Sequence, residues 1–321
     1  MRWSSFKQNR KDIILSMKGA LKHIKHGPSR GIYEAYSRLF HGKPNLILDE
    51  DWDNMIILDA CRFDTFCKIN WLDGKLESRI SIGSVTGQFL LRNFPNTYPD
   101  IVFIAGNPHA SRLIPDRFHA FIPAWQSHWD EKLGTVPPDL MSEAVCEASD
   151  KYPNKRIFAH FVQPHQPYIG PKALEKFGTE YSNGLRVARE MAESNESRGT
   201  PYTTTMDRYR SGEISRDEVV KAYEENLEIG LEAVNRLVSQ LSGKTVISSD
   251  HGEMFGEFAW PFPTRRIGHW NNIRTTELIK VPWFELPYEN RKKISKGTIQ
   301  ESDAVSDKEQ IRKLRSLGYF V

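Results

Sequence analysis

The chain has 321 residues, of which 39% are hydrophobic and 26% charged, the balance of an ordinary soluble globular protein. No apolar run approaches the roughly 18 to 20 residues that span a bilayer, and we expect no secretory signal because the N-terminus is charged and has no apolar segment. The three cysteines, Cys61, Cys67 and Cys146, lack metal-finger spacing, so a reducing cytoplasm with free thiols is the simplest interpretation.

Residues 1–44 form a basic arm with ten Lys or Arg residues and two acidic residues, although the net charge of the whole chain is only +3. Apolar residues recur there at helical spacing, which predicts a basic amphipathic helix that ends near Gly27 and Pro28. This helix either lies on an anionic membrane surface through residues 1–26, which would make the protein peripheral to the membrane, or packs on the body with its basic face in solvent. We expect no nucleic-acid partner, because no binding motif is present.

Short apolar runs alternate with amphipathic stretches from about residue 45 onward. Strands alternating with helices indicate an α/β domain whose central sheet is mostly parallel and covered by helices on both faces. Strands are predicted at 54–60, 100–107, 156–165 and 245–249, and helices at 138–152 and from a capping box at 215–218 to about residue 241.

Three parts of the chain are therefore expected after the arm is set aside. A catalytic domain covers residues 45–295. Residues 170–214 are polar and break the strand–helix pattern, so they are interpreted as an insertion or a lid over the site. Residues 296–321 are interpreted as a C-terminal tail that packs on the domain.

Polar side chains follow two of the predicted strands. Asp59 ends the first strand, and Asp250 and His251 follow the last. Ligands of open parallel sheets bind beyond the carboxyl ends of the strands, so these side chains can converge at one edge. Carboxylates favour Mn, Mg or Ca, and an added imidazole favours Zn, while Gly252 would let the backbone turn tightly beneath the metal. The alternative is an aspartate that caps the next helix beside a surface histidine.

Six stretches carry a resemblance to a known family, and they occur in the family's order. They are "MIILDACRFDTF" (55–66), "SIGSVTGQF" (81–89), "HFVQPHQPY" (160–168), "VISSDHGE" (246–253), "GHWNNIRTTELIKVPWFE" (268–285) and "IRKLRSLGYFV" (311–321). From about residue 50 to its end, the chain resembles the alkaline phosphatase–sulfatase superfamily, and sulfatase-like members in particular. The resemblance implies an alkaline phosphatase-like α/β fold and a metal-dependent hydrolase or transferase.

The resemblance implies roles for individual residues. Asp59 matches the first metal ligand, and Asp250 and His251 match the paired ligands after the last core strand. The nucleophile is expected at the start of a helix, where Thr86 is our choice and Ser84 the alternative, unless both only cap that helix. Metal coordination and a helix N-terminus would both lower the pKa of the alcohol, so Thr86 is expected to act as metal ligand and nucleophile.

Two histidines match family residues that bind either a second metal or the anionic oxygens of the substrate. These are His165 and His269, which we expect to contact substrate and to protonate the leaving oxygen. Gln163 stands where a second metal would favour a carboxylate, so one tightly held divalent metal (Mn, Zn, Mg or Ca) is expected. His160 is expected to be a core residue of its strand.

Arginines supply further candidates for binding an anionic ester. Arg62 either binds the substrate or forms a structural ion pair with Asp64. Arg265, Arg266 and Arg274 lie close in sequence to the second histidine and are also candidates.

The cysteines favour phosphate over sulfate chemistry. Many sulfatases carry their formylglycine precursor in C-x-P-x-R or C-x-A-x-R, and no cysteine of this chain has that context. With Thr86 or Ser84 as nucleophile, the expected function is hydrolysis or transfer of phosphate esters, and less so of sulfate esters, on a glycan or lipid-linked substrate. The alternative is a non-catalytic, metal-containing, sulfatase-like protein that binds anionic glycans.

Overall fold

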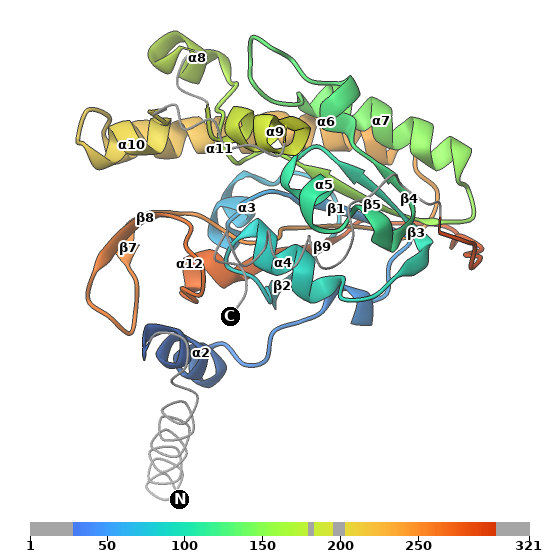
Figure 1. Cartoon of the computed structure of the whole chain (residues 1–321), viewed down its shortest axis with the longest axis horizontal. Coiled ribbons are helices and arrows are strands. Elements are labelled where there is room, and N and C mark those ends of the chain that lie inside the picture. Colours follow the sequence, from blue (N-terminus) through green and yellow to red (C-terminus); the bar gives the residue numbers. More distant parts are fainter. Residues whose placement is uncertain (1–27, 179–182, 195–202, 300–321) are drawn as a thin grey trace, which may run out of the picture.

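A seven-stranded sheet forms the centre of the computed structural model, which describes residues 28–178, 183–194 and 203–299 (Figure 1). Its strands are β1 (Asn54–Leu58), β2 (Lys75–Ile80), β3 (Tyr98–Ala105), β4 (Phe118–Ile122), β5 (Arg156–Phe161), β6 (Thr245–Ser248) and β9 (Lys280–Glu285). Their order is β2-β9-β6-β1-β5-β3-β4. Every neighbouring pair from β6 to β4 is parallel, and only β9 runs antiparallel to both of its neighbours. The prediction of a mostly parallel sheet is confirmed, whereas the reversed strand β9 was not predicted.

Helices cover both faces of this sheet, as predicted. The helices of the described residues are α2 (Pro28–Phe40), α3 (Phe63–Ile69), α4 (Thr86–Asn93), α5 (His109–Leu113), α6 (Ala124–Ser127), α7 (Pro138–Lys151), α8 (Pro171–Phe177), α9 (Asn183–Ser194), α10 (Thr205–Arg210), α11 (Arg216–Val238) and α12 (Thr276–Ile279). Crossovers between parallel strands are right-handed. Those through α4 and α5 step toward β4, and those through α7 and α11 step back, so the two pairs of helices lie on opposite faces.

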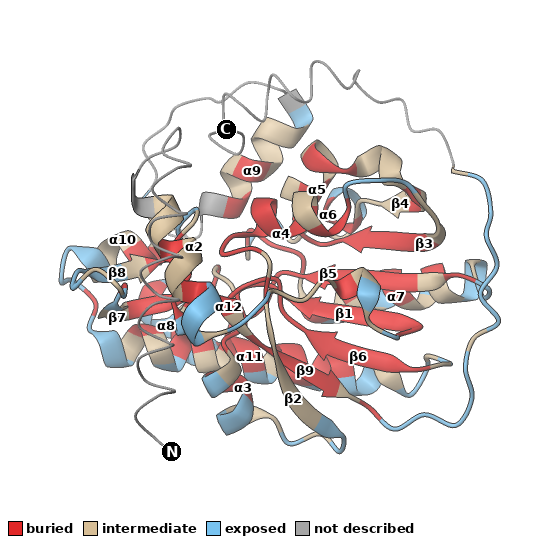
Figure 2. Cartoon of the chain, turned by 90° about the horizontal axis from the view of Figure 1, so that it is seen from below, coloured by how far each residue is buried: buried red, intermediate tan, exposed pale blue. Residues whose placement is uncertain are grey.

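The core lies along the middle strands, which are buried over their whole length (Figure 2). Met55 to Leu58 alternate between the two faces of β1, yet each is at most 1% exposed. A strand covered on both faces needs such a continuous apolar run. On one face, Phe94 packs edge-on against Phe103 and Phe158, with ring centroids 5.9 and 5.1 Å apart.

A smaller sheet follows the central one in the chain. Strands β7 (Met254–Phe258) and β8 (Arg265–Gly268) pair antiparallel as a hairpin. In Figure 1 the hairpin lies to the left of the main sheet, between α10 and α2. The Tyr33 hydroxyl of α2 donates a hydrogen bond to the Ala259 carbonyl at 3.0 Å, and its ring contacts Phe262. Helix α2, which was not predicted within the arm, is therefore anchored on the hairpin loop.

Residues 170–214, predicted to be an insertion or lid, contain α8, α9 and α10. A second apolar cluster joins this segment to α11 and β7 through Phe177, Met206 and Phe255. The Tyr209 hydroxyl also donates a hydrogen bond to the Phe255 carbonyl at 2.8 Å. The segment thus packs on the hairpin that follows β6, while its action as a lid stays a prediction.

Two predictions concern the ends of the chain. The helix predicted within residues 1–26 lies outside the described residues, as does the predicted tail beyond residue 299. The described start of that tail contacts the domain, because the Gly297 N–H donates to the Pro99 carbonyl at 3.1 Å. In the described part of the chain, no helix combines the length and the apolar character that crossing a membrane requires.

Candidate active site

The side chains that follow β1 and β6 lie together, as the sequence predicted. These neighbouring strands are parallel and in register, with Ile57 opposite Ser248, so their carboxyl ends reach the same edge. Asp250 Oδ1 accepts a hydrogen bond from the Ala60 N–H at 3.0 Å. His251 Nε2 lies 3.8 Å from Asp59 Oδ1 and 3.4 Å from Asp250 Oδ2. Two carboxylates and one imidazole therefore meet in a buried space.

Thr86 brings a hydroxyl into this group from the first turn of α4. Its Oγ1 donates a hydrogen bond to Asp250 Oδ2 at 2.8 Å and lies 3.2 Å from His251 Nε2. The alternative nucleophile, Ser84, points elsewhere. Its hydroxyl lies 3.1 Å from Gln88 Oε1 and 2.9 Å from the Trp270 carbonyl, so Ser84 secures the loop before α4. The geometry favours Thr86 as the reactive alcohol.

The orientation of His251 is fixed by the backbone. Its Nδ1 lies 2.8 Å from the Gly252 carbonyl, which can only accept, so Nδ1 carries the hydrogen. Nε2 consequently presents its lone pair to Thr86 and the two aspartates. A histidine held in this way offers Nε2 as a metal ligand, with the carbonyl as the supporting partner.

His160 was expected to be a core residue of its strand, and it also lies against the same carboxylates. It is fully buried, but Nε2 lies 3.6 Å from Asp59 Oδ2 and 3.7 Å from Asp250 Oδ2. Strand β5 neighbours β1, and His160 pairs with Ile57, two residues before Asp59. His160 therefore lies near the carboxyl end of β1, which Asp59 follows. Burial lowers the pKa of His160 to about 4, which keeps its ring neutral and its lone pair available.

The first cluster, Asp59, His160 and Asp250 together with Thr86 and His251, fits a divalent cation. Both ring nitrogens of His160 and Oδ1 of Asp59 are buried without a hydrogen-bond partner among the described residues. Burial and the neighbouring charge of Asp250 raise the pKa of Asp59 well above its usual range. Buried polar atoms without partners are costly, and a cation would satisfy them while neutralising both carboxylates. Asn107, two residues beyond the end of β3, donates to Asp59 Oδ2 at 2.6 Å and holds that side chain in place.

A second cluster consists of His165, Glu253 and His269. Their candidate ligand atoms lie within 4.8 Å of one another. His269 Nδ1 lies 3.1 Å from Glu253 Oε2, and the ring centroids of His269 and His251 are 4.5 Å apart, so the two clusters adjoin. Burial opposes charge on His269, but the carboxylate of Glu253 outweighs it and raises the pKa of His269. Glu253 supplies the acid that the sequence analysis sought at Gln163.

Two further residues, Gln163 and Arg62, have structural roles. The Gln163 side chain is buried, and its Nε2 donates to the Val136 carbonyl at 3.3 Å. Arg62 is ion-paired with Asp64 at 2.6 Å and with Glu257 at 2.7 Å, which favours the ion-pair alternative over ester binding.

Gly252 differs from expectation. Its φ is not in the left-handed region, so no tight turn requires glycine there. A Cβ at Gly252 would lie 2.0 Å from the Glu277 carbonyl oxygen, so glycine is needed for close packing against α12.

The sequence analysis missed Glu253, His160 and Asn107 as site residues. Asn107 follows a predicted strand, as Asp59 does, so the strand-end rule could have found it. Glu253 stands beside the proposed ligand pair, but nothing in the sequence shows that it faces His165 and His269. His160 had the correct strand position and was assigned to the core.

No protein-family model matches the sequence, and no curated protein matches it at significant similarity. Solved structures with some likeness include the integral membrane protein lipooligosaccharide phosphoethanolamine transferase A (EptA) from Neisseria meningitidis, with 11% identity, a TM-score of 0.43 and coverage of 72% of this chain and 47% of that chain. The periplasmic domain of phosphoethanolamine transferase EptC from Campylobacter jejuni has 12% identity, a TM-score of 0.43 and coverage of 72% and 77%. The corresponding EptC domain from Escherichia coli has 12% identity, a TM-score of 0.44 and coverage of 74% and 72%.

This chain spans less than half of EptA. With TM-scores below 0.5 the likeness does not extend to activity. The activity of this chain has to be inferred from its own side chains.

Proposed function

We propose that the chain is a metal-dependent hydrolase or transferase of phosphate esters with Thr86 as its nucleophile. One observation carries the proposal: the Thr86 hydroxyl, at the start of α4, lies within 2.8 Å of Asp250 Oδ2 and 3.2 Å of His251 Nε2. An alcohol that only caps a helix has no need of a buried carboxylate and imidazole. The environment instead suits an alcohol that must lose its proton.

The residues that would hold a divalent cation are Asp59, Asp250 and His251 together with Thr86, and His160 lies within reach of the same position. When bound, the cation would lower the pKa of the alcohol and offset charge on the phosphoryl group. The carboxylate-containing second cluster suits a second cation better than direct contact with an anionic ester, because Glu253 would repel the ester. This proposal replaces the expectation of a single metal, which rested on Gln163.

The chain's own residues then define the reaction. Asp250 accepts the hydrogen bond from Thr86 Oγ1 and so directs an oxygen lone pair outward. Attack on phosphorus forms the bond from Oγ1 and breaks the bond to the leaving oxygen, which leaves phosphothreonine at position 86. Where the second cluster holds no cation, His165 or His269 would protonate the leaving oxygen. Water or an acceptor alcohol then attacks phosphorus and restores Thr86.

The substrate class is proposed more coarsely. A phosphate ester on a glycan or lipid-linked molecule remains our prediction, since it rests on the basic arm within residues 1–44. A place at the cytoplasmic face of the membrane is proposed on the same ground.

The test uses metal-stripped protein re-supplied separately with Mn, Zn, Mg or Ca. Aryl phosphate monoester, aryl phosphodiester and aryl sulfate are offered in parallel, with Thr86→Ala and Asp250→Ala as controls. Metal-dependent turnover of one phosphate ester, lost in both variants, supports the proposal and selects the ester class. Turnover of the sulfate alone contradicts the phosphate assignment. Metal binding without turnover of any ester, together with binding of an anionic glycan, favours the non-catalytic alternative.

A further inference from the structure

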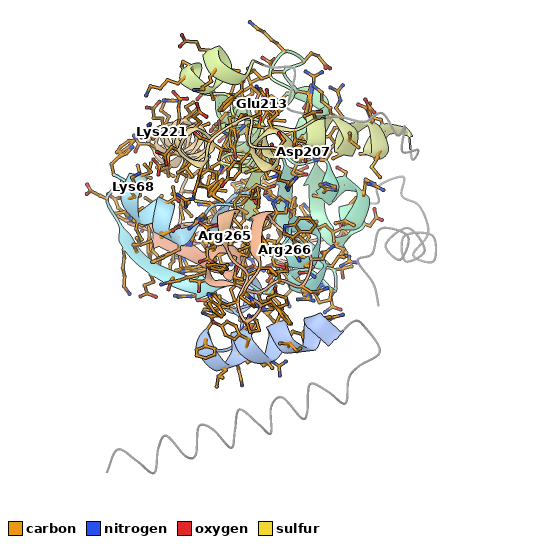
Figure 3. The ribbon with its side chains drawn as sticks, turned by 90° about the vertical axis from the view of Figure 1, so that its left-hand side faces the viewer. Lys68, Asp207, Glu213, Lys221, Arg265 and Arg266 are labelled. Carbon is orange, nitrogen blue, oxygen red and sulfur yellow. The ribbon has the colours of Figure 1, made fainter. Side chains whose placement is uncertain are left out.

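A basic pocket of about 420 Å³ opens on the β7–β8 hairpin, next to the second cluster. Four arginines from three elements line it: Arg210 at the end of α10, Arg216 at the start of α11, and Arg265 and Arg266 of β8. Figure 3 faces this side of the molecule, with Arg265 and Arg266 labelled on the hairpin. The Trp270 ring forms part of the wall and lies within 6 Å of two guanidiniums, those of Arg210 and Arg266.

Gly268 lies close to both the pocket and the second cluster. This glycine has a φ of +90°, and a Cβ there would lie 2.7 Å from Arg210 Nη2 and 3.9 Å from Glu253 Oε1. Arg210 Nη2 also donates to the Ile267 carbonyl at 3.0 Å, which holds the guanidinium at this position. The pocket and the catalytic residues are therefore two neighbouring compartments of one surface.

The pocket wall is also tied to the nucleophile loop. The Trp270 carbonyl lies 2.9 Å from the Ser84 hydroxyl, two residues before Thr86. Two residues further, Asn272 Oδ1 accepts a hydrogen bond from Gln88 of α4 at 2.7 Å. A ligand that spans both compartments would thus meet a connected set of loops.

The charge in the pocket is positive and partly uncompensated. Asp207 pairs with Arg210 at 2.6 Å, and Glu257 contacts Arg216 at 3.3 Å but is shared with Arg62. Among the described residues, the remaining two arginines have no carboxylate partner.

Backbone carbonyls hold two of these guanidiniums in place. The Arg216 Nε donates to the Phe255 carbonyl at 3.0 Å, and Arg265 Nη1 donates to the Gly256 carbonyl at 2.6 Å. A guanidinium has five N–H donors, so several remain for a ligand. Fixed guanidiniums suit the two-oxygen geometry of a phosphate.

We propose that this pocket binds a second phosphate group of the substrate while the reacting ester lies at Thr86, an inference that rests on the proposed function. The favoured substrate is then a polyol head group that carries two phosphates. Such a group occurs on a soluble phosphosugar or on a lipid, and both present the same chemistry to the arginines.

The test measures binding by isothermal titration calorimetry, with the full chain in a Thr86→Ala background and fixed Mn²⁺. The probes are glucose 1,6-bisphosphate and glucose 1-phosphate. We expect the bisphosphate to bind roughly tenfold more tightly, as one charge-assisted contact to an arginine would provide, here to Arg266, whose guanidinium lies 5.6 Å from the Trp270 ring centroid. Arg266→Ala should remove most of this preference. Arg236→Ala, which deletes an exposed arginine at the other end of α11, should retain it.

A second arm identifies the source of the phosphate. Phosphatidylcholine vesicles with and without phosphatidic acid are tested for binding to the same variants. Binding that depends on both Arg266 and phosphatidic acid, without preference for the soluble bisphosphate, supports the pocket and places the phosphate on a lipid. If neither probe distinguishes the parent from Arg266→Ala or from the Arg265→Ala/Arg266→Ala double variant, and thermal melting shows each folded, the inference is wrong.

Failure of the proposed function gives a different pattern. Wild-type protein would then turn over no ester, while the Arg266-dependent preference for the bisphosphate persists in binding. That result supports the pocket as an anion site and removes only Thr86 as a nucleophile.

Discussion

The two clusters at the sheet edge solve the problem of buried charge in opposite ways. The first places two aspartates beside a neutral histidine, and Asp59 and His160 retain buried atoms without partners. In the second, Glu253 already has a partner in His269 at 3.1 Å, and both histidines are only partly buried. The first cluster is therefore incomplete without a cation, whereas the second compensates its own charge. We expect the first cluster to bind metal more tightly and to be the essential one.

Removing the nucleophile should have the largest effect. Thr86→Ala is expected to lower kcat by about 10³-fold or more, because among the described residues only the Thr86 hydroxyl contacts both Asp250 Oδ2 and the His251 ring. Thr86→Ser keeps the alcohol and is the matched control, with substantial activity expected. The measurement is kcat on whichever aryl phosphate the wild type hydrolyses. Similar rates for the alanine and serine variants would exclude Thr86 as the nucleophile.

Metal content should separate the two clusters. Asp250→Asn is expected to lower the metal affinity of the first cluster by at least about 100-fold, because one of its carboxylates is lost. The tightly held cation should then be absent from the purified variant. Glu253→Gln should leave that cation in place and lower only the occupancy of the second cluster. Elemental analysis after dialysis against graded metal concentrations gives both values. Equal loss from both variants would mean that the clusters act as one site.

The role of His160 provides a finer test. His160→Phe conserves a ring of similar bulk, so an ordinary core position would accept it with unchanged metal affinity. If His160 is a member of the first cluster, its replacement by Phe should instead lower metal affinity by about 10- to 100-fold. Titration with Mn²⁺ or Zn²⁺, alongside a thermal melt to confirm folding, distinguishes the two. Unchanged affinity in a folded variant would return His160 to the core.

Asp53 is a third buried aspartate, and it lies outside the site. Its replacement is expected to have the smallest effect of the changes considered, and that effect is on stability. Asp53 accepts hydrogen bonds from the Lys244 and Lys292 N–H groups and from Arg291 Nε. Burial opposes its charge, but these bonds outweigh burial and lower the pKa of Asp53. Asp53→Asn should therefore cost about 1–3 kcal/mol in the free energy of unfolding near neutral pH.

The pH dependence of that cost follows from its sign. Because the folded-state pKa of Asp53 is lowered, its charge stabilises the fold above the ordinary aspartate pKa of about 3.9, and this contribution is lost as the pH falls through the lowered value. Urea denaturation near neutral pH and in acid should show the gap between wild type and Asp53→Asn narrowing in acid. Asp139→Asn, an exposed change of equal charge, is the control. A constant gap would contradict the assignment.

Local rules predicted the parts of this site that depend on strand ends. Asp59 and Asp250 follow apolar runs, and parallel strands end at a common edge, so their meeting was foreseeable. Thr86 was chosen because its stretch resembles the family's nucleophile at a helix start. The first prediction needed only two strands and their common direction, whereas the second needed the resemblance.

Contacts between distant segments were not foreseeable from one sequence. Glu253 belongs to the start of the hairpin, and only the return of β8 brings His269 to it. The arginine pocket draws on the ends of three elements, which no periodicity relates. The antiparallel β9 has an apolar sequence like the parallel strands β1 and β6, because it is also buried, so its direction could not be predicted from the sequence.

The tight approach of Gly252 to Glu277 has a consequence for protein engineering. The backbone at Gly252 has no room for a methyl group, and the Gly252 N–H donates to the Leu278 carbonyl at 2.9 Å. This position is therefore a rigid joint between the segment after β6 and helix α12. Upstream of this joint, His251 cannot be moved without moving α12 as well. Downstream, the exposed Arg265 and Arg266 can be replaced without affecting this contact, whereas the pairing of β8 with β7 must be kept because it brings His269 to Glu253. Substitutions intended to change substrate preference are therefore best made at these exposed hairpin residues, while the ligands of the first cluster are left unchanged.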